Sequence, residues 1–187
     1  TTRKGEITVD TDEQPGKGNP EKIPQLKAAF AKDGTITAAT SSSISDGAAA
    51  LVLTRQSVAE KLGKAPIARV VAHAAHAQEP AKFTSAPVPA IQKVLEKAGW
   101  SVEDVDLFEV NEAFACVAMI AMRDIGIPHE KINVNGGATA LGHPIGASGA
   151  RILTTLVAAL QDRGLKRGVA SLCIGGGEAT AMAVELI

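Results

Sequence analysis

The chain has 187 residues and a formal net charge of −1, from 19 Lys and Arg against 20 Asp and Glu. This balance argues against a nucleic-acid partner or a polybasic membrane patch, because both need a surplus of basic residues. Hydrophobic residues make up 45% of the sequence, which excludes disorder as the main state. No apolar run reaches the roughly 20 residues of a membrane span.

The N-terminal part of the chain contains a polar stretch that cannot build a hydrophobic core by itself. Residues 11–33 are polar and contain several Pro and Gly, so we expect them to run over another surface, away from the core. The apolar run Leu51–Thr54 predicts a short strand. Residues 57–63 predict a short helix that is capped by Ser57 and ends at Gly63.

From residue 68 onward, patterns of strands and helices alternate. Helical spacing of apolar residues covers 88–98, 112–125 and 152–160, and short apolar runs predict strands at 68–72, 106–110, 132–134, 169–174 and 181–186. This alternation indicates an α/β sheet. The last two strands are joined by Gly175–Gly177, which predicts an antiparallel pair.

The Gly-rich stretch 133–151 is the first place where chemistry is expected. It joins a predicted strand to a predicted helix and holds His143 between Gly142 and Pro144. Such turns bring backbone close to a ligand and direct helix N–H groups at negative charge. The ordinary alternative is a structural turn with a satisfied His, but the Gly density and the rigid Pro favour a working imidazole. The spacing is neither a Walker motif nor a dinucleotide fingerprint.

A second candidate is Cys173, at the end of a predicted strand and followed by Gly175–Gly177. A thiol there can meet a substrate while backbone N–H groups face an oxyanion. The alternative is a small buried Cys that only packs, and we assign that role to Cys116 on its Ala-rich helix. The two Cys lie far apart without a zinc-type spacing, which argues against a disulfide framework, and a reduced, cytosol-like compartment fits better.

A third candidate is the sequence Asn111-Glu112-Ala113-Phe114, where a predicted strand meets a helix. Open α/β sheets bind ligands beyond the carboxyl ends of their strands. Each residue also has an ordinary role: Asn111 as helix cap, Glu112 on the helix dipole and Phe114 in the core. Three other histidines are treated as surface or packing residues, with only a weak case for a metal site at the first two: His73, His76 and His129.

Taken together, these motifs resemble the thiolase family, in particular its acetoacetyl-CoA thiolases (acetyl-CoA acetyltransferases). The motifs are Asn-Glu-Ala-Phe at 111–114, Gly-Gly-x₄-Gly-His-Pro-x-Gly-x-Ser-Gly-x-Arg at 136–151 and Cys-x-Gly-Gly-Gly at 173–177. The resemblance implies an α/β, thiolase-like fold, the C-terminal half of a layered αβαβα architecture with a mixed sheet. It divides the chain into the end of the loop domain (1–45), the last piece of the N-terminal domain (46–65) and the C-terminal domain (66–187).

The resemblance also implies catalytic roles. His143 would activate a nucleophilic Cys and help to bind the thioester oxygen. Cys173 would be the acid/base that takes a proton from the methyl group of acetyl-CoA and returns it in thiolysis. Asn111 would hold a water that completes one oxyanion hole, and the backbone N–H of Gly175 would serve the second.

Substrate contacts follow from the same resemblance. Ser42 would contact pantetheine, Leu26 and Phe30 would face the adenine end of CoA, and Phe83 would line the acyl or pantetheine channel with Phe114 close by. The implied partners are acetyl-CoA and other acyl-CoA substrates, with no cofactor and no metal. A cytoplasmic homo-oligomer, dimer or tetramer, with no nucleic acid and no membrane, is expected.

The implied reaction is Claisen condensation of two acetyl-CoA to acetoacetyl-CoA, or the reverse thiolysis of a 3-ketoacyl-CoA. The family's nucleophilic Cys belongs to an N-terminal half that this sequence does not contain. A second departure is local, because Thr40 and Ser45 stand where relatives usually carry Asn. The alternative function is a non-catalytic acyl-CoA or lipid-binding module, which the presence of both His143 and Cys173 disfavours.

Overall fold

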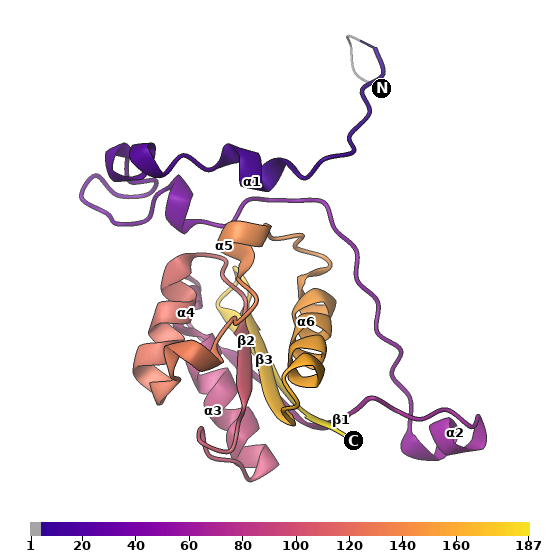
Figure 1. Ribbon diagram of the computed structural model, residues 1–187. Coiled ribbons are helices and arrows are strands. Elements are labelled where there is room, and N and C mark those ends of the chain that lie inside the picture. Colours follow the sequence, from indigo (N-terminus) through magenta and orange to yellow (C-terminus); the bar gives the residue numbers. More distant parts are fainter. Residues whose placement is uncertain (1–4) are drawn as a thin grey trace.

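A four-stranded mixed sheet forms the centre of the molecule in the computed structural model, which describes residues 5–187 (Figure 1). In the order β1-β4-β3-β2, β2 and β3 are parallel and the other neighbours are antiparallel. The mixed sheet and the antiparallel final pair are therefore confirmed. The strands are β1 (Ala68–Ala77), β2 (Leu107–Val110), β3 (Arg167–Cys173) and β4 (Glu178–Leu186).

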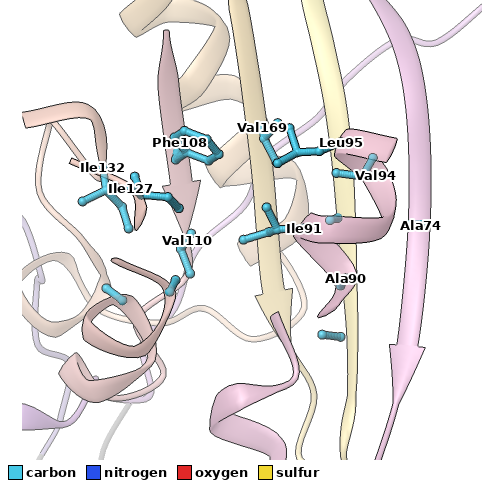
Figure 2. Close-up of a cluster of buried hydrophobic side chains, with 14 of the residues drawn as sticks. Ala74, Ala90, Ile91, Val94, Leu95, Phe108, Val110, Ile127, Ile132 and Val169 are labelled. Atoms are coloured by element: carbon cyan, nitrogen blue, oxygen red, sulfur yellow. The ribbon is translucent and has the colours of Figure 1, made fainter. Parts of the chain in front are cut away.

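Helices cover both faces of this sheet. On one face, α3 (Pro87–Ala98) and α4 (Ala115–Ala121) pack over a cluster that includes Ile91, Phe108 and Val169 (Figure 2). On the other face, α6 (Ser148–Asp162) packs over a smaller cluster of Leu107, Ile152, Leu156, Ala159, Leu160, Ala170 and Val184. Alternation along β2 therefore sends Phe108 and Val110 toward one layer and Leu107 and Glu109 toward the other.

The helix predicted at 88–98 is confirmed, because its apolar stripe and its stop signal are both local. Ile91 and Val94 are fully buried, and Gly99 ends the helix in the left-handed conformation with φ 68°. The helix predicted at 57–63 forms as α2 (Gln56–Lys61), but Ser57 does not cap it. Arg55 occupies the cap position without a side-chain bond, which places Ser57 inside the first turn.

Three other expectations were wrong in detail. Residues 51–54 form no strand, and Val52 is 97% exposed, because no strand of the described chain pairs with them. The strand expected at 132–134 is reduced to one bridge between Ile132 and Phe108. The helix expected from residue 112 begins at Ala115 as α4 and continues as a π-helical turn over Met122–Gly126.

The N-terminal segment extends beyond the end of the sheet near α5 (Ala138–Leu141) (Figure 1). It holds α1 (Glu13–Lys17) and 3-10 turns at Pro20–Gln25 and Ala38–Thr40. Residues 18–33 are exposed apart from half-buried Ala28. Two further 3-10 turns lie at Pro80–Ser85 and His129–Lys131. The domain boundaries expected at residues 45 and 65 stay predictions, and residues 1–4 lie outside the described part.

Within residues 5–187, no helix is long and apolar enough to cross a bilayer.

Candidate active site

Asn111 is the first residue beyond β2, at the carboxyl end of the parallel strand pair. Its backbone N–H donates to the carbonyl of Ser171 on β3 at 2.9 Å, which continues the β2–β3 hydrogen bonding by one residue past the strand. Phe114 is extended and forms a bridge to Ser41. The helix therefore starts after this segment with Phe114 at its cap position, so the alternative role of Asn111 as helix cap does not apply. Its buried side chain is left for other contacts.

His143 is held in place by the residues on both sides of it. Its backbone N–H donates to the carbonyl of Ser43 at 2.8 Å. Gly142 has φ 87°, and a Cβ there would overlap Ser45. A Cβ on Gly47 would come within 2.7 Å of Pro144. Segment 43–47 and the loop around His143 therefore pack without room for side chains at these glycines.

The imidazole of His143 lies in a chain of four polar contacts. Arg151 Nη2 lies 3.4 Å from Asn111 Oδ1, and Asn111 Nδ2 lies 3.5 Å from His143 Nε2. His143 Nδ1 lies 2.6 Å from the hydroxyl of Ser148, which donates to the carbonyl of Pro144 at 3.0 Å. The first two contacts are long for hydrogen bonds, whereas the contact of His143 Nδ1 with Ser148 is short.

The two ends of this chain determine where the protons lie. Arg151 is only a donor, so it donates to the oxygen of Asn111, and the amide nitrogen of Asn111 then faces His143. That nitrogen donates, so His143 Nε2 must accept. The ring proton is then on Nδ1 and donates to Ser148, whose own proton goes to the carbonyl of Pro144. This assignment of hydrogens gives a neutral imidazole with its lone pair on Nε2.

Electrostatics favours the same neutral form. Burial of the half-buried ring lowers the pKa of His143, and the nearby Arg151 guanidinium lowers it further. At neutral pH the ring is therefore a base that can take a proton on Nε2.

Glu112 does not lie in the first turn of α4, whose first residue is Ala115, so it is not placed to interact with the dipole of that helix. Its carboxylate accepts from the backbone N–H of Thr139 at 3.1 Å and from the amide of Asn133 at 3.2 Å. Asn133, at φ 48°, bonds to both the N–H and the carbonyl of Val110. These contacts attach the Gly-rich loop to the end of β2. They replace the dipole role that the sequence suggested for Glu112.

Cys173 is buried at the end of β3, which is parallel to β2, the strand that Asn111 directly follows. Burial raises the pKa of its thiol to about 11. A tight turn follows, in which the N–H of Gly177 donates to Ile174 at 3.0 Å. Gly175 is exposed, and its N–H donates to no acceptor in the described chain. The convergence of Cys173 and Gly175 on His143 stays a prediction.

Three aromatic rings lie beside this site in a row. Phe114 makes edge contacts with Phe30 at 5.7 Å and with Phe83 at 6.1 Å between ring centroids. Phe30 is 74% exposed despite this contact, and it belongs to the exposed N-terminal segment 18–33. Leu26 is also exposed, and the hydroxyl of Ser42 donates to the carbonyl of Ala113 at 2.9 Å. CoA contacts by these residues stay predictions.

The remaining candidates have ordinary surroundings. His76 lies between Lys93 and Gln78, at 3.0 and 3.2 Å, and Cys116 is half-buried on α4. No cluster of three His, Cys, Asp or Glu in the described chain could hold a metal ion. The sequence had not indicated roles for Asn133, Ser148 or Arg151. The signal was available for the last two, because both belong to the motif that contains His143.

Comparison with known families decides what this site belongs to. Residues 64–186 match the model of "Thiolase, C-terminal domain", and residues 1–57 match "Thiolase, N-terminal domain". The chain belongs to the thiolase family. Two acetyl-CoA acetyltransferases, one from Syntrophomonas wolfei and a cytosolic one from Mus musculus, are each 49% identical over 99% of this chain. The chain spans 47% of the length of each, about half of a curated thiolase relative.

Solved structures establish the thiolase fold. The acetyl-CoA acetyltransferase of Bacillus anthracis covers all of this chain with a TM-score of 0.91 and 43% identity, over 48% of its own length. Human mitochondrial 3-ketoacyl-CoA thiolase in complex with CoA covers 91% with a TM-score of 0.83 and 38% identity, over 43% of its length. The expected α/β, thiolase-like class is therefore confirmed.

Proposed function

We propose that this chain supplies the acid–base and oxyanion groups of an acetyl-CoA C-acetyltransferase. The reaction would join two acetyl-CoA to acetoacetyl-CoA, or cleave a 3-ketoacyl-CoA in reverse. The supporting observation is the contact of Asn111 with His143, whose Nε2 lone pair is directed away from Ser148. A module that only binds acyl-CoA or lipid would not need an imidazole held in one tautomer.

In the first half-reaction, His143 Nε2 takes the proton of a nucleophilic Cys that is contributed from outside these 187 residues. The thiolate attacks the carbonyl carbon of acetyl-CoA, and negative charge develops on the thioester oxygen. The new N–H of His143, with a water held by Asn111, stabilises that oxygen. The CoA thiolate leaves and takes a proton from Cys173, so an acetyl-enzyme and a Cys173 thiolate result.

In the second half-reaction, the Cys173 thiolate removes a proton from the methyl group of a second acetyl-CoA. The N–H of Gly175 stabilises the enolate oxygen, and the carbanion attacks the acetyl-enzyme. Acetoacetyl-CoA forms, and the released enzyme thiolate recovers its proton from His143. The raised pKa of Cys173 suits this step, because a thiol with a higher pKa gives a stronger base once it has lost its proton.

The proposed partners are acetyl-CoA and other acyl-CoA substrates, and the proposed assembly is a cytoplasmic homo-oligomer, dimer or tetramer. Support for the ligand comes from the human relative that was solved with CoA. Support for the compartment comes from the mouse relative that is named cytosolic.

The test compares two cysteine variants in the complete enzyme that contains this chain. Cys173→Ser should reduce condensation at least a hundredfold, because a hydroxyl is a far weaker acid than a thiol. Labelled acetyl-CoA should still produce acetyl-enzyme in this variant. Cys116→Ser is the matched control and should condense at close to the wild-type rate. Near wild-type condensation by Cys173→Ser would contradict the assignment.

A further inference from the structure

Glu109 is a buried carboxyl group on the side of β2 that faces α6. It is 2% exposed. Leu107, two residues earlier on the same side of the strand, packs with Ile152 and Leu156 of α6. The carboxyl group of Glu109 is therefore directed toward the first turns of that helix, where Arg151 lies.

Glu109 and Arg151 each leave one buried polar atom without a partner in the described chain. These atoms are Oε1 of Glu109, an acceptor, and Nε of Arg151, a donor. Buried polar atoms are normally paired, and each exception needs a reason. Burial raises the pKa of Glu109 to about 7, the Arg151 charge acts to lower it, and Glu112 acts to raise it. The charge of Arg151 therefore acts on Glu109 across the contact between β2 and α6, although the two groups form no ion pair in the described chain.

The position of Arg151 on its helix is also unusual. It lies in the first turn of α6, where the partial positive charge of the helix dipole disfavours a cation. Its guanidinium contacts the oxygen of Asn111, while the carboxyl group of Glu109 is buried on the neighbouring strand. Packing of α6 alone does not need a guanidinium here.

We propose that Arg151, with buried Glu109 nearby on β2, is a positioning residue that fixes the orientation of the Asn111 amide and thereby the tautomer of His143. This inference rests on the function proposed above. With Arg151 in place, the oxygen of Asn111 faces the guanidinium and its nitrogen faces the site. Without it, the amide can rotate and present its oxygen, which would repel the negative charge that develops on the thioester.

The chain offers a matched control for Arg151. Arg163, at the other end of α6, donates through Nη2 to the oxygen of Asn135 at 3.0 Å, which is the same pair of groups far from His143. In the complete enzyme, Arg151→Met should lower kcat roughly a hundredfold, the loss expected for one oxyanion donor, with KM changed less than about threefold. Arg163→Met should leave both parameters within about twofold of wild type.

Conservative variants separate positioning from folding. Arg151→Lys keeps a donor near Asn111, so its kcat should be at least tenfold higher than that of Arg151→Met. Glu109→Gln should lower kcat roughly tenfold without lowering the melting temperature, because it removes a buried ionisable group. If Arg151→Met unfolds the enzyme, the kcat values of Arg151→Lys and Glu109→Gln test the positioning role instead. Wild-type kcat in Glu109→Gln, or no difference between Arg151→Met and Arg163→Met, would overturn the proposal.

A readout independent of activity distinguishes this inference from the proposed function. In ¹⁵N-histidine spectra of the complete enzyme, His143 should show a protonated Nδ1 and an unprotonated Nε2 in wild type and Arg163→Met. Arg151→Met should give a mixture of tautomers. If the wild-type enzyme shows this pattern but no thiolase activity, the proposed function fails while the positioning role stands. A single unchanged tautomer in Arg151→Met would overturn the positioning role even in an active enzyme.

Discussion

The amide nitrogen of Asn111 lies 3.5 Å from Nε2 of His143, although the two residues are 32 positions apart in the sequence. The parallel pairing of β2 with β3 delivers Asn111 to the end of the sheet, and the bond from His143 to Ser43 delivers the imidazole. This relationship orients the base and the oxyanion partner together.

Ser148→Ala should lower kcat at least tenfold, because Nδ1 of His143 loses the acceptor that keeps its proton there. Thr154→Ala is the matched control on the same helix, since its hydroxyl bonds to the carbonyl four residues earlier just as that of Ser148 does. Steady-state kinetics of both variants would check this. Equal kcat values in the two variants would show that the Ser148 contact does not select the tautomer.

The stability of the protein should decrease with rising pH because of Glu109. Its pKa rises from 4.5 to about 7 through burial, so the folded state holds a proton that the unfolded state releases. The free energy of unfolding should therefore fall by roughly 3 kcal/mol between pH 4.5 and pH 7. Glu109→Gln should lack this decrease.

Urea denaturation of wild type and Glu109→Gln at pH 5 and pH 8 measures this effect. The difference between the two proteins isolates Glu109 from His143, whose lowered pKa acts in the opposite direction below pH 6.5. As the pH rises, the free energy of unfolding of Glu109→Gln should increase relative to that of wild type. An unchanged difference across this range would mean that Glu109 ionises like an exposed carboxyl group.

Phe83→Ala in the complete enzyme should favour longer or branched acyl groups by roughly tenfold in kcat/KM relative to acetyl-CoA. The reason is the edge contact of Phe83 with Phe114, next to the site, which removal of the ring would open. A series of 3-ketoacyl-CoA substrates of increasing chain length provides the measurement. Relative rates equal to those of wild type across the series would exclude Phe83 from the acyl channel.

Trypsin should cut the N-terminal segment first, at exposed Lys27 and Lys32. Phe30→Ala should speed this cleavage two- to tenfold, because the edge contact with Phe114 contributes about 0.5–1.5 kcal/mol. Ile23→Ala removes an exposed apolar side chain from the same segment and serves as the control. Mass spectrometry of timed digests would follow the cuts. Equal rates in the two variants would show that Phe30 does not anchor the segment.

Much of the fold follows from local sequence patterns. The stripe of α3, its end at Gly99 and the final antiparallel pair involve residues that lie close together in the chain, so periodicity and turn residues are sufficient to predict them. The patterns failed where a distant partner decides the structure. Residues 51–54 are apolar enough for a strand but have no strand beside them in the described chain.

The sequence by itself determined which residue types carry the chemistry: an Asn after a strand, a His in a Gly-rich loop and a Cys before three Gly. Only the tertiary structure decided how Asn111 and His143 are used. From the sequence, Asn111 was equally compatible with a helix cap, but its backbone bonds to Ser171 of β3 and the helix begins only at Ala115. The tautomer of His143 depends on a donor from α6 and on the carbonyl of Pro144, and folding alone brings these groups to the same ring.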